Sequence, residues 1–174
     1  LSQSTISYRD FDHRRSVTFI KPDFIIVSDR IVPADMTVKN TYRQAWHMPV
    51  DSDFTVDYNK FSAKTNYKSG ANLYIASTGD AYPKTGSGWY DYSSGQVGEN
   101  PYMYYELSEK SGTAEIDTVL LPYEGSADVT VQRLYSDKNT GSYTALKADV
   151  TRNGAKSTVY YVQNCSDESG APLY

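Results

Sequence analysis

Hydrophobic and polar positions alternate along most of this chain with a period of two residues, not the period of about 3.6 of an amphipathic helix. Eleven stretches show either this alternation or a short run of β-branched and aromatic residues, both typical of β-strands. They cover residues 15–20, 24–27, 36–46, 54–57, 60–66, 73–76, 102–107, 114–121, 129–134, 144–150 and 158–162. The pattern predicts an all-β fold, a single antiparallel β-sandwich of about eleven strands with almost no helix.

Local signals predict one turn and part of the core. Asn153-Gly154, between the last two predicted strands, is typical of a tight hairpin. The run from Phe24 to Val27 is apolar throughout, so we expect a strand that is buried on both faces. No linker or internal repeat divides the chain, which predicts one domain over residues 1–174. The predicted core comprises Val17, Phe19, Ile25, Val27, Leu73, Ile75, Val119, Leu121, Val129, Val131 and Val159.

One segment interrupts the strand pattern. Thr78 to Pro101 contains five glycines and two prolines, and we expect it to form a long loop. It carries Trp89, Tyr90 and Tyr92, and large aromatic side chains in a long loop favour a functional role over disorder. An aromatic face suits the C–H face of a sugar ring, and phenol hydroxyls can bond to sugar hydroxyls. The loop therefore predicts a contact surface for a polysaccharide.

Other residues extend this predicted surface. Arg43 can pair with a carboxylate in a bidentate geometry, so an acidic polysaccharide is one candidate ligand, while neutral glycans stay possible. Of the tyrosines on the 102–107 strand, Tyr102 and Tyr104 are expected to share one face and Tyr105 to take the other. The alternative is that the tyrosines only line the core and its rim, in a structural domain that binds no ligand. The candidate carbohydrate-binding residues are Trp89, Tyr90, Tyr92, Tyr42, Arg43 and His47.

Composition and charge exclude several classes of protein. The formal net charge is −4, with 17 basic and 21 acidic residues spread evenly, which argues against a nucleic-acid-binding protein. No apolar run approaches the length of about 18 residues that a membrane helix needs, so we expect no membrane partner. A single cysteine, Cys165, excludes an internal disulfide framework and a zinc site of several cysteines.

The sequence offers little for metal or nucleophilic chemistry. His13 and His47 are the only histidines, and neither lies in a recognisable catalytic motif. The stretch that holds Asp51, Asp53 and Asp57 lacks the glycine and the closing glutamate of an EF-hand loop. Phosphate-binding and dinucleotide-binding fingerprints are absent from the sequence. We therefore expect no metal site, no cofactor and no catalytic residue.

Segments in a fixed order resemble the β-sandwich of heparinase II/III-like polysaccharide lyases. The stretch from His13 to Asp29 resembles the run H-x-R-x-V-x-F-x-K-P-x-Y-x-x-V-x-D of that family. Trp46-His47-Met48-Pro49 resembles the W-H-x-x-P segment that follows it. The stretches 88–105 and 118–123 resemble its pattern G-W-x-S-x-x-Y-G, then P, then L-x-Y, then T-x-L-x-P-Y. Together these segments span roughly residues 8 to 135.

This resemblance implies a secreted or periplasmic bacterial enzyme in which an α/α-toroid precedes the sandwich, and which cleaves acidic polysaccharide by β-elimination. The chain would then be the C-terminal sandwich alone, a fragment or module whose partners are the polysaccharide and the missing catalytic domain. The family's catalytic Tyr, His and Asn or Glu lie in the toroid, and its metal-binding H-x-H pair is not found here. Arg15 and Asp29 match the family pattern and are interpreted as structural. We expect a non-catalytic carbohydrate-binding or accessory domain without lyase turnover of its own.

Overall fold

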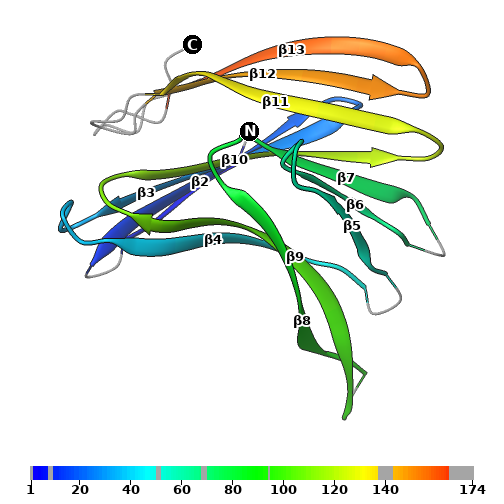
Figure 1. Ribbon diagram of the computed structural model, residues 1–174, viewed down its shortest axis with the longest axis horizontal. Coiled ribbons are helices and arrows are strands. Elements are labelled where there is room, and N and C mark those ends of the chain that lie inside the picture. Colours follow the sequence, from blue (N-terminus) through cyan, green and yellow to red (C-terminus); the bar gives the residue numbers. More distant parts are fainter. Residues whose placement is uncertain are drawn as a thin grey trace.

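The chain folds almost entirely into β-strands (Figure 1). A computed structural model describes residues 2–7, 10–49, 52–67, 70–93, 95–136 and 143–164. These residues contain no helix, and so none that could cross a membrane, which confirms the predicted all-β fold. The strands are β1 (Ser2–Ser7), β2 (Phe11–Ile20), β3 (Phe24–Pro33), β4 (Asn40–His47), β5 (Phe54–Asp57), β6 (Ser62–Thr65), β7 (Asn72–Ser77), β8 (Tyr82–Ser93), β9 (Gln96–Lys110), β10 (Ala114–Tyr123), β11 (Ala127–Ser136), β12 (Tyr143–Arg152) and β13 (Ala155–Asn164).

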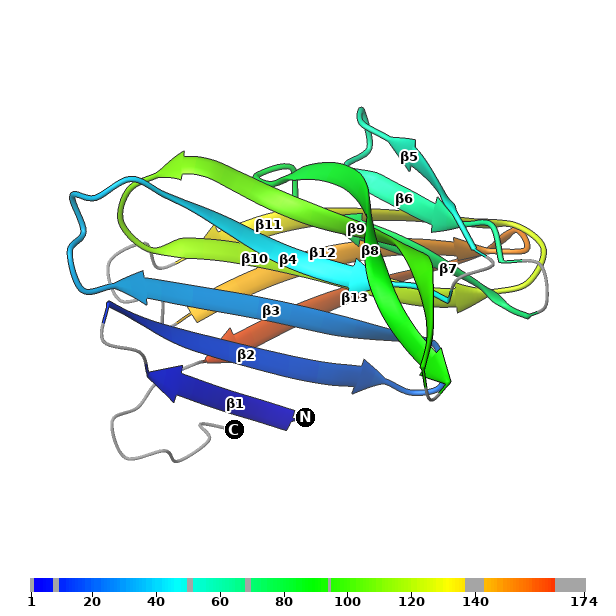
Figure 2. The ribbon, with the colours of Figure 1, turned by 90° about the horizontal axis from the view of Figure 1, so that it is seen from below.

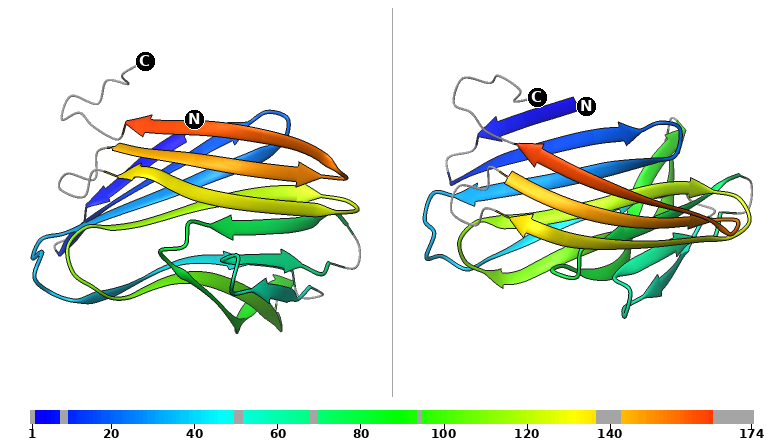
Figure 3. Two further views of the ribbon diagram at one scale, coloured as in Figure 1. Left: turned by 45° about the horizontal axis from the view of Figure 1, so that its top comes forward. Right: turned by 90° about the horizontal axis from the view of Figure 1, so that it is seen from above.

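The strands form three antiparallel sheets stacked in layers. The central sheet has seven strands in the order β1-β2-β3-β10-β7-β6-β5. A three-stranded sheet in the order β11-β12-β13 covers its upper face in the view of Figure 1, and a second one, in the order β4-β9-β8, lies against its lower face. Figure 3 shows the same layers from two further directions. Strands β3 and β10 lie inside this stack, which explains the apolar run from Phe24 to Val27.

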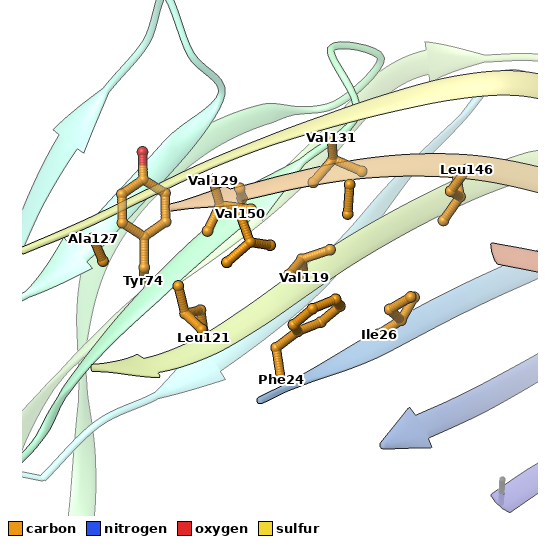
Figure 4. Close-up of a cluster of buried hydrophobic side chains, with 12 residues drawn as sticks. Phe24, Ile26, Tyr74, Val119, Leu121, Ala127, Val129, Val131, Leu146 and Val150 are labelled. Carbon is orange, nitrogen blue, oxygen red and sulfur yellow. The ribbon is translucent and has the colours of Figure 1, made fainter. Parts of the chain in front are cut away.

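Two hydrophobic clusters fill the spaces between the layers. The upper cluster lies between the central sheet and the β11-β12-β13 sheet and includes Phe24, Val119 and Val129 (Figure 4). The lower cluster lies against the β4-β9-β8 sheet and includes Val27, Met103 and Tyr105. Every predicted core residue belongs to one of these clusters or packs against it, except one.

Phe19 is that exception, and its prediction as a core residue is wrong. Its side chain is 52% exposed. It shares a face of β2 with Val17, which turns toward the lower layer. Unlike Val17, it is not among the residues that pack against the lower cluster, although the β4-β9-β8 sheet lies on this side of the central sheet (Figure 2).

The loop predicted over Thr78–Pro101 is also wrong, because most of this segment forms the long hairpin of β8 and β9. The hairpin runs out past the body of the central sheet (Figure 1). Gly86 makes room for a ring of the neighbouring strand, since a Cβ atom at this position would lie 2.7 Å from Cζ of Tyr102 on β9. Glycines inside a strand interrupt the alternation of apolar and polar residues, so the sequence pattern no longer predicts a strand there.

The predicted turn at Asn153-Gly154 is confirmed. It joins β12 to β13, whose pairing continues to Arg152 and Ala155. Asn153 has φ of 49° and Gly154 has φ of 84°, the pair of positive angles that a two-residue type I′ turn requires.

Candidate functional site

The outer face of the β4-β9-β8 sheet carries a group of aromatic and charged side chains. In the register of β4 and β9, Arg43 lies opposite Glu106 and His47 opposite Tyr102. The intervening residues of β9, Met103 and Tyr105, are buried in the lower cluster. Because successive side chains of a strand point to opposite faces, Tyr102, Tyr104 and Glu106 point away from the central sheet. The predicted division of the three tyrosines between two faces is confirmed.

Three rings and one guanidinium form a continuous row across this face. Cζ of Arg43 lies 5.0 Å from the centroid of the Tyr104 ring. The Tyr104 and Tyr102 rings are stacked with centroids 5.8 Å apart, and the His47 ring stacks on Tyr102 at 5.0 Å. We call Arg43, Tyr104, Tyr102 and His47 the aromatic row. Offset stacking and the cation–π contact hold the rings in fixed positions on the surface.

The polar groups beside the row give it a local positive charge. Glu106 accepts a hydrogen bond from Nε of Arg43 at 2.6 Å, one from Nζ of Lys84, and one from the Ser108 hydroxyl at 2.7 Å. The Glu106 side chain is 4% exposed, whereas Arg43 and Lys84 are 59% and 47% exposed. Two cations face one carboxylate that lies beneath them. An approaching ligand therefore meets the cations first, although the whole chain carries a net charge of −4.

The bonds from Lys84, Ser108 and Arg43 lower the pKa of Glu106 to about 2. A carboxyl group with a depressed pKa stabilises the fold above its unfolded pKa, and this contribution is lost as the pH falls toward the folded value. We expect Glu106 to stay ionised down to about pH 3 and the Arg43–Glu106 pair to separate near pH 2. An NMR titration of the Glu106 carboxyl carbon measures this. A midpoint near the ordinary value of 4.5 would contradict it.

The six predicted site residues do not form one cluster. Arg43 and His47 belong to the aromatic row. Tyr42 points the opposite way, toward the central sheet, and its buried Oη has no hydrogen-bond partner within the described residues. Trp89 is 80% exposed and pairs with Glu99 in the register. It lies an odd number of positions from Gly86, the partner of Tyr102, so its side chain points to the opposite face of the hairpin from the aromatic row.

Two of the predicted residues lie partly outside what the structure describes. Tyr90 and Tyr92 belong to β8, but their side chains are not among the described residues. Conversely, the predicted site omitted Tyr102 and Tyr104, which form the middle of the row, and Lys84, which stands beside it. The alternation of Tyr102, Tyr104 and Glu106 along β9 was the available signal for them.

A second polar group links the central sheet to β4. Asp29 is 2% exposed and accepts hydrogen bonds from Arg15 Nε and Nη2, both at 2.7 Å, and from Gln44 Nε2 at 2.8 Å. His13 Nε2 lies 2.9 Å from the same carboxylate. Burial raises the pKa of Asp29, but the bonds from Arg15, Gln44 and His13 outweigh it and hold the pKa below its ordinary value. The arrangement joins β2, β3 and β4, in line with the structural role expected of Arg15 and Asp29.

The metal site that the family resemblance implies does not fit these residues. The Arg15 guanidinium bonds to both carboxylate oxygens of Asp29, so a cation already neutralises that group. No three His, Cys, Asp or Glu side chains come together in the described parts of the chain. Two of the acidic residues considered as calcium ligands have other partners: Asp53 accepts a hydrogen bond from the Asn66 side chain, and Asp57 accepts one from the backbone N–H of Asn59. Asp51 lies outside the described residues.

Two of three comparisons with known proteins find the same group of enzymes. No protein-family model matches the chain. The chain is 25% identical over 163 residues to heparin-sulfate lyase of Pedobacter heparinus, a match that covers 91% of this chain and 24% of that protein. The crystal structure of heparan sulfate lyase from Pedobacter heparinus has 23% identity and a TM-score of 0.74, over 91% of this chain and 25% of that one. A crystal structure of heparinase III has 16% identity and a TM-score of 0.70, over 92% and 27%.

These matches agree in what they cover. The chain spans about a quarter of the length of the curated relative, and the solved structures share the fold over a similar portion. The residues that suggested the resemblance lie within a match that extends over nearly the whole chain. The predicted resemblance is therefore confirmed: this chain resembles the C-terminal β-sandwich domain of heparinase II/III-like polysaccharide lyases.

Proposed function

We propose that this chain is the sandwich domain of a polysaccharide lyase and that it contacts the polysaccharide through the aromatic row. The similarity to heparin-sulfate lyase supports the first part. The row on the open face of the β4-β9-β8 sheet is the observation that carries the second. The domain serves as an accessory to a catalytic domain elsewhere in the protein. A polymeric glycan is met outside the cytoplasm, so we propose a secreted or periplasmic location in a bacterium.

The row suits an anionic glycan. Tyr102 and Tyr104 are half-buried, so their rings are fixed while part of each stays open to a sugar. Glu106 engages Nε of Arg43, which leaves the terminal nitrogens of the guanidinium to bind a uronate or a sulfate group. Lys84 supplies a second cation next to Tyr104 in the strand register. Stacking and charge pairing thus act within one short stretch of surface.

Trp89 adds a second point of contact on the β8–β9 hairpin. Its side chain is 80% exposed, on a hairpin that extends beyond the central sheet. A polymer can reach both surfaces, although they lie on opposite faces of β8. Contacts of this kind are few and local, so we expect a dissociation constant of roughly 0.1–1 mM, equivalent to about −4 to −5.5 kcal/mol.

Affinity electrophoresis in gels that contain heparan sulfate, or a neutral glucan, tests this function. We expect heparan sulfate to retard the chain, and Tyr104→Ala and Trp89→Ala each to weaken retardation, by up to about tenfold in affinity for the loss of one stacked ring. Tyr160→Ala serves as the matched control, because Tyr160 is 68% exposed on β13 in the opposite outer layer. Thermal unfolding confirms that each variant is folded.

Two results would contradict the proposal. An unretarded wild-type chain would favour a purely structural domain that braces its catalytic partner. If Tyr104→Ala and Trp89→Ala were retarded as strongly as Tyr160→Ala, the contact with the glycan would lie elsewhere on the domain.

A further inference from the structure

The described residues cover the lower face of the central sheet only in part. Gln44 Nε2 on β4 bonds to Asp29 on β3, at 2.8 Å, so β4 lies over β3. Tyr105 Oη on β9 donates to the carbonyl oxygen of Ile75 on β7, at 3.1 Å, so β9 lies over β7. Strands β2 and β1 come after β3 in the central sheet and lie beyond the free edge of β4. Figure 2, which looks at this side, shows β1 and β2 with no strand drawn over them.

The face of β2 on this side is only partly covered, and it is not the face of a solvated strand. Its residues are Phe11, His13, Arg15, Val17 and Phe19, which we call the β2 strip. An antiparallel strand that faces water normally alternates apolar and polar residues, with the polar ones outside. Val17 already packs against the lower cluster and Arg15 bonds to Asp29, but Phe19, on the same face, is 52% exposed. An exposed phenylalanine on a face that is otherwise partly buried indicates a surface that another segment covers in the whole protein.

The neighbouring strand β4 is an edge strand. It pairs with β9 on one side only, within the described residues. Every second residue of such a strand directs its backbone N–H and C=O away from the partner, a template for a further strand. The open edge of β4 points toward the β2 strip.

A cavity of about 630 Å³ lies where the strip meets β4. Its lining includes Phe11, His13 and Ile31 from the central sheet and Tyr42 from β4. The buried Oη of Tyr42 has no hydrogen-bond partner in the described part of the chain. A buried hydroxyl without a partner is costly, and a segment that filled the cavity could supply a carbonyl oxygen for it.

We propose that the free edge of β4 and the β2 strip bind an additional β-strand. Neighbouring strands lie about 4.8 Å apart and stacked sheets about 10 Å apart. Since β4 lies over β3, a strand added at its free edge would lie over β2, the next strand of the central sheet. The inward side chains of the added strand pack on Phe11, Val17 and Phe19. The added strand carries apolar residues at alternate positions.

The strand comes from another segment of the same, longer polypeptide. The relative is about four times the length of the matched region, since that region makes up 24% of it. A segment tethered to the domain is present at a high effective concentration and occupies the edge before other chains can. The edge of β4 is then not open to aggregation in the longer protein. This inference rests on the proposal that the chain is a domain of a longer enzyme, but not on its contact with polysaccharide.

Hydrogen exchange of the isolated chain and of the full-length gene product tests the inference. We expect amides of β4 that face the open edge to exchange about tenfold or more faster in the isolated chain, with β10 protected in both. Hydroxyl-radical labelling of Phe19 should fall in the full-length protein to a similar degree. Labelling of Tyr160, which is exposed on the opposite layer, should stay the same.

Phe19→Asp in the full-length protein should restore fast exchange at β4, whereas Tyr160→Asp should not. Equal exchange of β4 and equal labelling of Phe19 in the two proteins would overturn the inference, and this comparison needs no variant to fold. Protection of β4 in the isolated chain that rises with its concentration would indicate a second copy as the occupant and would overturn it too. Neither readout depends on glycan, so failure of polysaccharide binding would leave them unchanged.

Discussion

Replacement of Val119 by aspartate is expected to unfold the domain, with a loss of more than about 4 kcal/mol in the free energy of unfolding. Val119 is fully buried on β10, in the middle of the central sheet. Its register partners are Ile26 on β3 and Ala76 on β7, and all three belong to the upper cluster. A carboxylate at this position would lose its hydration with apolar side chains around it, or would have to take up a proton.

Urea denaturation followed by circular dichroism measures the effect. Val162→Asp is the matched control, since Val162 is 72% exposed on β13 and its replacement should change stability by less than about 0.5 kcal/mol. A Val119→Asp chain that unfolds within about 1 kcal/mol of the wild type would contradict the placement of the upper cluster at the centre of the fold.

Replacement of Asp117 by alanine is expected to cost about 3–5 kcal/mol, because it removes a fully buried carboxylate that two largely buried arginines share. Asp117 is fully buried on β10 and accepts bonds from Arg30 Nη1 at 3.1 Å and from Arg133 Nη2 at 2.6 Å. Arg30 is itself 1% exposed, so water cannot replace the lost carboxylate. Glu115 is the other carboxylate close to Arg30, at 3.2 Å from its Nε, and would become its main partner, while Arg133 would keep Asp80 and Glu115. These groups join the central sheet to β11.

Chemical denaturation again gives the measurement, with Asp128→Ala as the control. Asp128 is 45% exposed, pairs with Lys60 at 2.7 Å and accepts a bond from Tyr74 Oη, which keeps Ser62 as a partner, so its loss should cost at most about 2 kcal/mol. If the two variants lost the same stability, the buried charges would not act as a linked group.

The sequence pattern predicts a strand well where the burial of that strand or its turn residues determine the pattern locally. Strand β3 was recognisable because two layers cover it, and the β12–β13 hairpin because Asn and Gly tolerate positive φ. Strand β8 was missed because Gly86 yields its space to a ring of β9, a contact between strands that no local pattern reveals. Phe19 was misplaced for a related reason: an apolar residue on a strand face does not show whether another layer reaches it.

The candidate site illustrates the same limit. Alternation along β4 already separates Tyr42 from Arg43 and puts Arg43 and His47 on one face. Tyr102 and Tyr104 were seen to share a face, but their stacking against His47 depends on the pairing of β4 with β9, more than fifty residues apart in sequence. The register of two distant strands is decided by the packed fold, so the aromatic row could not be assembled from the sequence.

The claim that this domain contacts polysaccharide through the aromatic row is tested most directly by NMR, with a heparan sulfate oligosaccharide titrated into the isotope-labelled chain. We expect saturable shifts, with a midpoint of roughly 0.1–1 mM, at Arg43, Tyr104, Tyr102 and His47. Signals of Tyr160 and Val162, exposed on the opposite layer, should not move. Unchanged signals of the row at saturating oligosaccharide, or shifts confined to the opposite layer, would contradict the claim.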